Sequence, residues 1–354
     1  MTTFTSLIDS LKQSRQLLIG LLVTGVITLV ALWLSKVPFI ASLGFGTLTL
    51  AIIIGIILGN TLYPTISQPC QAGVHFAKQR LLRLGIILYG FNLTFQQVFS
   101  VGLSAIIIDT LIIATTFTLA YTLGRKVFGL DKETTVLIGA GASICGAAAV
   151  MATEPLLKTT SSKVAVAIAT VVIFGTLAMF VYPWLYQLNA SVGIIDFSQS
   201  RFGIYIGSTV HEVAQVVAAG NAISVDTANA AVITKMIRVM MLAPFLIVLS
   251  AFLQRSASTE HGSKSPIVIP WFAVMFIVVA GFNSLHLLPS SWVAALQFID
   301  TLFLAMAMTA LGLTTHISAI RQAGTKPLML AALLFIWLIL GGFMINETVH
   351  SLLG

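Results

Sequence analysis

Residues 203–221 read GIYIGSTVHEVAQVVAAGN, an apolar stretch about long enough to cross a bilayer, with His211 and Glu212 near its middle. A charged group near the bilayer centre costs roughly 2.5–3.5 kcal/mol on insertion scales, so such residues usually face a protein interior or an aqueous cavity. The stretch therefore predicts a chain embedded in a membrane and a site within it.

The composition of the whole chain supports a membrane protein. Of 354 residues, 58% are hydrophobic and 8% are charged, and the mean hydropathy is +1.02. Soluble globular chains carry about 25% charged residues, so this chain has too few to cover a water-facing surface. The long unbroken apolar runs exclude a β-barrel, and we expect an all-α polytopic membrane protein.

Runs of mostly apolar residues about 18 or more long predict the membrane spans. About eleven are expected, at 17–34, 43–62, 73–92, 102–123, 134–152, 163–182, 203–220, 228–251, 267–285, 292–313 and 327–345.

Basic residues predict the orientation, since they concentrate in cytoplasmic loops. With the N-terminus cytoplasmic and the C-terminus periplasmic, the residues expected inside are Lys78, Arg80, Arg83, Arg125, Lys126, Lys132, Arg201, Arg255, Lys264, Arg321 and Lys326. Lys36, Lys158 and Lys163 fall on the opposite side. The loop bias accounts for most of the net charge of +7, so the lipid bilayer is the expected partner and nucleic acid is not.

An internal repeat predicts the domain organisation. GTLTLAIIIGIILGN at 46–60 and GSTVHEVAQVVAAGN at 207–221 have equal length and share their first and last residues. Residues 1–36 then form a cytoplasmic N-terminus with an extra helix, and 37–185 and 186–354 form two five-helix repeats. An odd number of crossings inverts one repeat against the other, as in transporters whose substrate lies between two discontinuous helices near the midplane.

The fourth helix of each repeat is the expected discontinuous one. TTVLIGAGASICGAAAVMAT at 134–153 is rich in glycine, which favours a break. FLAMAMTALGLTTHIS at 303–318 contains Thr309 and Gly312 as candidate substrate contacts. Small residues also permit close packing of unbroken helices, and the sequence leaves both interpretations open.

Four polar residues recur at helical spacing in 203–220, namely Ser208, His211, Glu212 and Gln215. A substrate or proton site is one interpretation, because histidine titrates near neutral pH. A hydrogen-bonded cluster between helices is the other. HEVAQ also approaches the zinc-protease HExxH pattern, but Gln215 replaces the second ligand, so we expect no catalytic residue, no metal, no cofactor and no enzyme activity.

Lys235 and Arg238 lie three residues apart within a predicted span. Arginine suits oxyanions, so an anionic substrate is one interpretation, and pairing with acidic residues or snorkelling to the interface is the other. Asp109 and Asp300 both stand in Ile-Asp-Thr-Leu, a resemblance that we attribute to coincidence. Asp300 remains a minor candidate for ion coupling.

GAGASICGAAAV, STVHEVAQVVAAG, the Lys235/Arg238 span and the ending ALGLTTHISAIRQAGTKPL together resemble the YeiH-type family of bacterial inner-membrane proteins, to which sulfate export is ascribed. The resemblance covers essentially the whole chain. It implies the inverted repeats and crossed, broken helices of the bile-acid/sodium symporter and cation/proton antiporter superfamily. It points to seven residues as the site: Ser143, Ile144, Cys145, Gly146, His211, Glu212 and Gln215.

The expected function is a secondary transporter of the bacterial inner membrane that moves a small anion, such as sulfate or a sulfonate, by alternating access. Lys235 and Arg238 would supply countercharge, the break at 143–146 would supply amides, and Glu212 with His211 would couple transport to protons. A sodium-coupled organic-anion symporter is the alternative, and a channel or an intramembrane enzyme is less favoured. The sequence leaves a homo-oligomer open.

Overall fold

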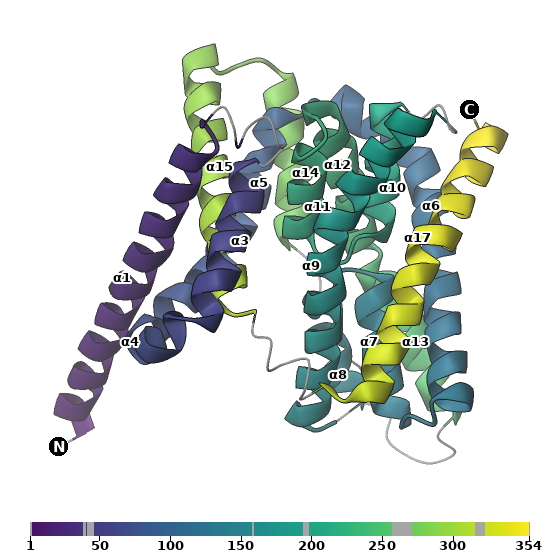
Figure 1. Ribbon diagram of the computed structural model, residues 1–354, viewed down its shortest axis with the longest axis horizontal. Coiled ribbons are helices and arrows are strands. Elements are labelled where there is room, and N and C mark those ends of the chain that lie inside the picture. The colour runs from purple at the N-terminus through teal and green to yellow at the C-terminus, as the bar shows by residue number, and fades with distance from the viewer. Residues whose placement is uncertain are drawn as a thin grey trace. The chain divides into compact units, whose positions relative to one another are not determined.

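The computed structural model describes residues 2–37, 40, 46–157, 159–193, 198–256, 271–315 and 323–353. Within these ranges the regular structure is helical, as the composition predicts (Figure 1). Lys158, Lys264 and Arg321, which enter the orientation prediction, lie outside the described residues. Six helical stretches of the described chain are long and apolar enough to cross a membrane: 13–34, 101–127, 162–192, 225–253, 290–313 and 325–353.

The described helices form two compact units, and each unit combines two segments that are separated in the sequence. Unit 1 comprises residues 1–95 and 275–317, and unit 2 comprises 96–274 and 318–354. The units therefore differ from the sequence halves 37–185 and 186–354, whose interpretation as inverted repeats remains a prediction.

Unit 1 is built on close pairs of helices. Its helices are α1 (Thr2–Leu34), α3 (Thr47–Asn60), α4 (Tyr63–Phe76), α5 (Leu82–Tyr89), most of α14 (Trp271–Ser284) and α15 (Ser290–Leu313). Gly55 of α3 faces Gly312 of α15, where a Cβ on Gly312 would lie 2.6 Å from the carbonyl oxygen of Ile52. No larger residue fits this approach, which explains glycine at both positions.

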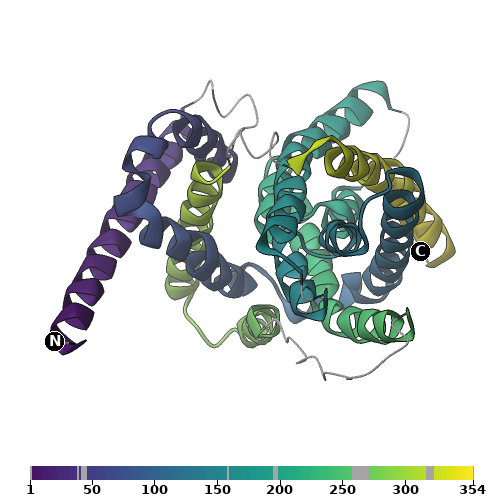
Figure 2. The same ribbon diagram turned by 90° about the horizontal axis from the view of Figure 1, so that it is seen from below.

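Unit 2 contains the remaining described helices. In chain order they are α6 (Phe95–Thr122), α7 (Lys132–Ser143), α8 (Ala147–Leu157), α9 (Ser161–Val192), α10 (Gln199–Thr209), α11 (Val213–Asn221), α12 (Val225–Met240), α13 (Leu242–Ser256) and α17 (Thr325–Leu353). Seen from below, α7 lies inside the ring of its neighbours (Figure 2). Every residue of α7 from Thr134 to Ser143 is buried accordingly.

Helices α7 and α8 form a hairpin instead of the single predicted span at 134–152. The ammonium group of Lys163, at the start of α9, lies 2.8 Å from carboxylate oxygens of both Asp131 and Glu133, at the start of α7. Since α8 ends at Leu157, only six residues before Lys163, it must return to the side from which α7 began. A Cβ on Gly141 would likewise touch Val150 of α8 at 2.8 Å.

Helices α10 and α11 form a second hairpin, which replaces the span predicted at 203–220. A Cβ on Gly203 of α10 would lie 2.5 Å from the Thr227 carbonyl, and one on Gly220 of α11 would lie 2.5 Å from Ala228 Cα. Both ends of this hairpin thus lie beside the start of α12. The two hairpins occupy opposite ends of unit 2, with α7 and α8 at its lower end and α10 and α11 at its upper end in Figure 1.

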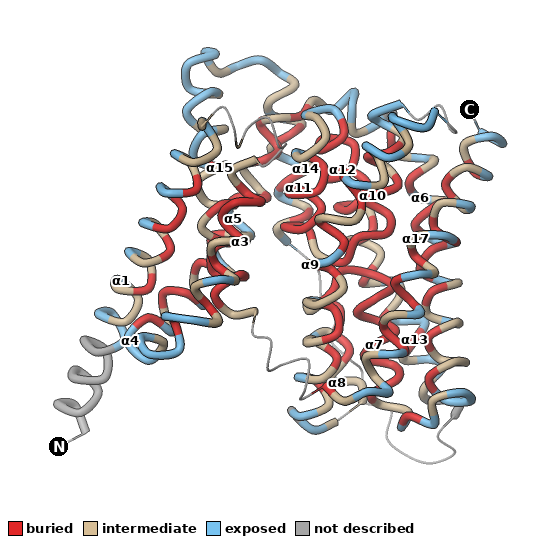
Figure 3. Tube along the Cα trace, in the orientation of Figure 1, coloured by how far each residue is buried: buried red, intermediate tan, exposed pale blue. Residues whose placement is uncertain are grey.

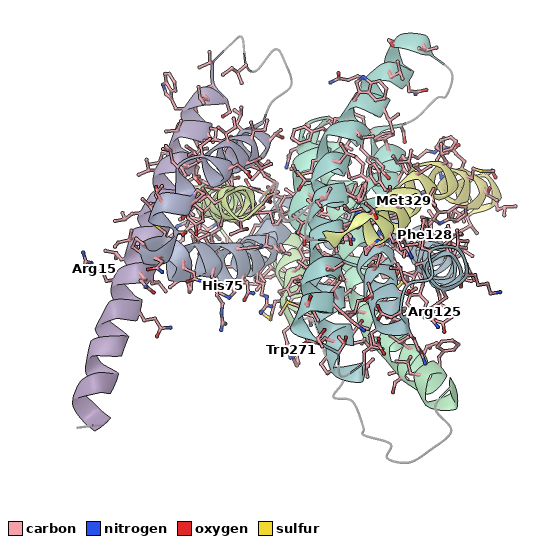
Figure 4. All side chains as sticks on the ribbon, turned by 60° about the horizontal axis from the view of Figure 1, so that its bottom comes forward. Arg15, His75, Arg125, Phe128, Trp271 and Met329 are labelled. Atoms are coloured by element: carbon pink, nitrogen blue, oxygen red, sulfur yellow. The ribbon has the colours of Figure 1, made fainter. Side chains whose placement is uncertain are left out.

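The two ends of unit 2 carry different charges. One end, the basic rim, is formed by the end of the α6 segment and the starts of α7, α9 and α17; its cations are Arg125, Lys126, Lys132, Lys163 and Lys326. Arg125 and Phe128 lie there near Met329 in Figure 4. At the opposite end Arg201 forms an ion pair of 2.8 Å with Glu347, and Asp226 stands in the first turn of α12.

Candidate functional site

The tips of the two hairpins meet inside unit 2. The first tip is the turn 144–146, where Gly146 adopts φ +70°, and the second is the turn 210–212. A Cβ on Gly146 would lie 2.6 Å from Glu212 Cγ, so the first tip approaches the second closely only because residue 146 is glycine. The surrounding chain is largely buried (Figure 3).

Lys235 of α12 links the two tips. It is completely buried, and its Nζ donates hydrogen bonds to the carbonyl oxygens of Ile144 at 2.6 Å and Val210 at 2.8 Å. These oxygens lie at the C-terminal ends of α7 and α10, where helices carry partial negative charge and lack intrahelical donors. One ammonium group therefore satisfies a carbonyl at each of the two helix ends.

Arg238, one turn further along α12, holds the first tip. It is completely buried, and its guanidinium donates to the Ser143 carbonyl through Nε at 2.9 Å and Nη2 at 2.6 Å. Nη2 also donates to the Ala142 carbonyl at 3.2 Å. The pair Lys235 and Arg238 lies at the predicted site, but its hydrogen bonds go to backbone carbonyls and not to acidic side chains.

The second tip brings a carboxylate to the start of α8. Glu212 is the N-cap of α11 in a capping box, and its backbone N–H donates to Gln215 Oε1 at 3.0 Å. Its own Oε1 accepts a hydrogen bond from the Ala147 N–H, the first residue of α8, at 3.5 Å. Glu212 and Ala147 are half-buried and Ala148 is exposed, so this junction reaches a surface of unit 2.

The predicted polar stripe on one helix does not form, because the chain leaves the helical conformation between Thr209 and Val213. Ser208 ends within α10, where its hydroxyl donates to the Tyr205 carbonyl and accepts from Asn346 at 3.1 Å. His211 and Glu212 lie in the extended turn, and Gln215 lies in α11. Valine and histidine at 210 and 211 give no sign of this break. The spacing of Glu212 and Gln215 does, since it matches a capping box.

Several buried polar atoms of unit 2 lack a hydrogen-bond partner among the described residues. At the hairpin tips they include the donors Arg238 Nη1 and Gln215 Nε2 and the imidazole Nδ1 of His211. Both carboxylate oxygens of Asp109, in the middle of α6, are also unpartnered. Asp109 interacts electrostatically with Arg238 and Lys235. Asp109 was not among the predicted site residues, because only the resemblance of its sequence context to that of Asp300 drew notice, and that resemblance was attributed to coincidence.

The structure thus brings nine of the twelve predicted site residues to the tips; Ser208 lies beside Asn346 in unit 2, and the other two belong to unit 1. The nine in unit 2 that surround or form the tips are Ser143, Ile144, Cys145, Gly146, His211, Glu212, Gln215, Lys235 and Arg238. Thr309 and Gly312 belong to unit 1. There α15 runs unbroken to Leu313, and Thr309 Oγ1 shares a hydrogen bond with Thr28 Oγ1 at 3.1 Å. A break of the helix at Thr309 and Gly312 was therefore predicted at the wrong place. Close packing of an unbroken helix accounts for the small residues at these two positions.

A known family matches most of the chain. The family described as Conserved hypothetical protein 698 matches residues 19–331. The chain belongs to this family. Its relatives include a UPF0324 membrane protein of Yersinia pestis, 66% identical over 94% of this chain and 93% of the relative. The UPF0324 inner membrane protein YeiH of Escherichia coli K12 is 61% identical, over 97% of this chain and 98% of the relative.

The family resemblance noted from the motifs is thereby confirmed. Among solved structures, the sodium proton antiporter MjNhaP1 from Methanocaldococcus jannaschii is 15% identical and aligns over 90% of this chain and 99% of its own, with a TM-score of 0.30. A TM-score this low does not show that the two proteins share a fold.

Proposed function

We propose that this chain is a secondary transporter of a small anion, such as sulfate or a sulfonate, and not an enzyme or a channel. The observation that carries the proposal is the meeting of two helical hairpins from opposite ends of unit 2, joined by Lys235. Discontinuous helices that meet near the bilayer midplane are the usual substrate sites of secondary transporters, because their ends expose unpaired backbone groups.

The polarity of the junction favours an anion. Both C-terminal ends, at Ile144 and Val210, are already satisfied by Lys235, whereas α8 presents its N-terminal end at a partly open surface. A helix N-terminus carries partial positive charge and free N–H groups, which favour anions. This one already donates the Ala147 N–H to a carboxylate oxygen of Glu212, and Arg238 Nη1 and Gln215 Nε2 are buried donors that could serve a further anion.

Glu212 is the proposed coupling residue, with His211 beside it. A carboxylate at the α8 N-terminus repels an incoming anion and competes with it for the same N–H, whereas a protonated carboxyl does neither. Binding of the anion and binding of a proton to Glu212 are then favoured together. Lys235 and Arg238 contribute positive charge to the junction, although their hydrogen bonds hold the hairpins.

The proposed orientation places the basic rim in the cytoplasm, because basic residues accumulate on that side. A single span at 134–152 would put Lys163 on the periplasmic side. Because the segment is a hairpin, Lys163 lies at the same rim as Arg125. Arg201, which was expected in the cytoplasm, then lies at the periplasmic end, where it forms an ion pair with Glu347. The C-terminus, at the far end of α17, is then periplasmic as predicted, and the inner membrane is the proposed location by analogy with the YeiH relatives.

The test uses purified protein and proteoliposomes. Sulfate, sulfite, sulfonates and carboxylates are screened by thermal shift, since a ligand that binds the folded state raises its stability. Flux of any hit is then measured against a pH gradient for the wild type, Glu212→Gln and the control Glu154→Gln in α8 of the first hairpin. We expect Glu212→Gln to flatten the pH dependence and Glu154→Gln to preserve it. Flux driven by sodium and indifferent to pH would favour the sodium symporter, and large unitary currents would establish a channel.

A further inference from the structure

Asp109 is a buried carboxylate without a hydrogen bond. It stands in the middle of α6, its residue is 0% exposed, and neither carboxylate oxygen has a hydrogen-bond partner among the described residues. Burying an ionised carboxylate without hydrogen bonds is costly, and the cost falls if the group binds a proton or a cation comes to it. Such a residue is not needed for packing, since an aliphatic side chain would fill the same space without that cost.

The two cations that act electrostatically on Asp109 are the ones that hold the hairpin tips. Arg238 and Lys235 both attract Asp109 electrostatically, with Arg238 the stronger. In the described chain, the cations that form ion pairs within 4 Å are Lys163 and Arg201, and their partners are other carboxylates. Asp109 therefore forms no direct ion pair there. Arg238 directs Nε and Nη2 to the first tip and leaves Nη1 unpartnered. The positive charge of Arg238 therefore attracts Asp109, while its hydrogen bonds hold the backbone of the first tip.

Other ionisable groups surround this arrangement. The tips contribute Cys145, His211 and Glu212, which interact with the α12 cations, and α9 contributes Tyr182, which interacts with Arg238. From α10 and α17, Arg201, Glu347 and His350 line a small hollow with Ile108, the neighbour of Asp109. Arg201 and Glu347 neutralise each other. The charges that act directly on Asp109 are therefore those of Arg238 and Lys235.

We propose that Asp109 binds and releases a proton, and that its charge controls how firmly Arg238 holds the tip of the first hairpin. With Asp109 protonated, the guanidinium faces no opposing carboxylate and stays on the Ser143 carbonyl. When Asp109 releases its proton to water, the carboxylate attracts the guanidinium through the free Nη1. The hydrogen bonds to Ser143 and Ala142 weaken, and the turn 144–146 loosens.

The chain supplies its own reporter of this loosening. Its two cysteines are Cys70 and Cys145, and Cys145 is buried within the first tip. In a Cys70→Ser background, the rate at which a maleimide labels Cys145 reports how often the tip opens. The rate is measured from acid to alkaline pH in this background and in the same background with Asp109→Asn. The thiol itself reacts faster at high pH in both proteins. The informative quantity is therefore the ratio, at each pH, of the labelling rate with Asp109 to the labelling rate with Asp109→Asn.

The expected ratio is close to one at acid pH, where both residues are neutral, and rises several-fold at alkaline pH, where only Asp109 is charged. A ratio that stays constant across the pH range overturns the proposal. The matched control is Asp300→Asn, the buried aspartate of unit 1 in the same Ile-Asp-Thr-Leu context, which should leave the labelling profile of Cys145 unchanged. A profile altered equally by Asp300→Asn also counts against Asp109.

If Asp109→Asn does not fold, Asp109→Glu provides the second variant. It retains a carboxyl group but changes its distance from Arg238, so the pH midpoint of the rise in labelling should shift; an unchanged midpoint rejects Asp109 as the titrating group. The inference rests on the proposed function only in treating the tips as the transport site. Labelling requires no cargo, so failure of the anion screen leaves this test intact, and a flat labelling ratio leaves the transport proposal intact.

Discussion

The backbone N–H of Ala147, the first residue of α8, donates a hydrogen bond to the carboxylate of Glu212, the N-cap of α11, with an N to O distance of 3.5 Å. The two residues are 65 positions apart in the chain. The contact places the N-terminal ends of two hairpin helices against one another, with the titratable side chain of Glu212 between them.

Lys235→Met should destabilise unit 2 strongly. The substitution keeps the length of the side chain but leaves the Ile144 and Val210 carbonyls without their donor. Hydrogen bonds to charged groups are worth about 1.5–3 kcal/mol each, so we expect a loss of roughly 3 kcal/mol or more in the free energy of unfolding. Denaturant unfolding in detergent measures it, with the exposed Lys326→Met as a control that should change little. Equal stability of the two variants would show that the tips do not depend on Lys235.

Gly146→Ala should cost more than Gly129→Ala. Both glycines have positive φ, +70° and +61°, so each substitution carries backbone strain of about 1–2 kcal/mol. Only at Gly146 would the new Cβ also meet a side chain, Glu212, whereas nothing lies within 4 Å at Gly129. The difference between the two losses of unfolding free energy measures the closeness of the tips. Similar losses would contradict that closeness.

Asp131 should make stability depend on pH in acid. Partial burial opposes its charge, but hydrogen bonds from Lys163 and from Thr134 hold the pKa of Asp131 well below its usual range. A carboxyl whose pKa is lowered on folding stabilises the protein above its unfolded pKa of about 3.9, and that contribution disappears as the pH falls through the folded value. The stability difference between wild type and Asp131→Asn should therefore be constant near neutrality and shrink below about pH 4. A difference independent of pH down to the acid limit would mean that the Lys163 contact is absent.

The hairpin structure of 132–157 predicts which side of the membrane its neighbours face. Single cysteines at Lys126 and Lys163, in a background without Cys70 and Cys145, should react with a membrane-impermeant maleimide from the same side of vesicles. A cysteine at Asp226 should react from the other side. If Lys126 and Lys163 react from opposite sides, the segment crosses the membrane as one span and the hairpin is wrong.

The sequence predicted the membrane character of the chain, and of the two hairpin tips it indicated only the first. Long apolar runs coincide with the six long apolar helices of the described chain, because apolar content alone decides which segments favour lipid. At 134–152 the glycine content favoured a break but left close packing of an unbroken helix open, and the structure has the break at 144–146, where Gly146 adopts a left-handed conformation that other residues avoid. The break at 210–212 was missed because Val210 and His211 resemble ordinary helix residues, and only the spacing of Glu212 and Gln215 signals the cap.

Hydropathy also could not separate a hairpin from a span. A pair of short apolar helices that turns back has the same composition as one long helix, so 134–152 and 203–220 were both predicted as crossings. The difference lies in contacts between distant residues, such as Lys163 with Asp131 at a separation of 32 positions. Asp109 was set aside for the same reason, since its proximity to Arg238 depends on how α6 and α12 pack.

The sequence by itself determined that this protein lies in a membrane as helices, that it belongs to its family, and which ionisable residues stand within apolar segments. Only the tertiary structure decided that Lys235 and Arg238 hold backbone carbonyls at the tips, that Glu212 meets the start of α8, and that Thr309 and Gly312 belong to another unit. The physical reason is that a helix end left open by a break can be satisfied from anywhere in the chain. Lys235 reaches Ile144 across 91 positions, a pairing that local propensity and periodicity do not encode.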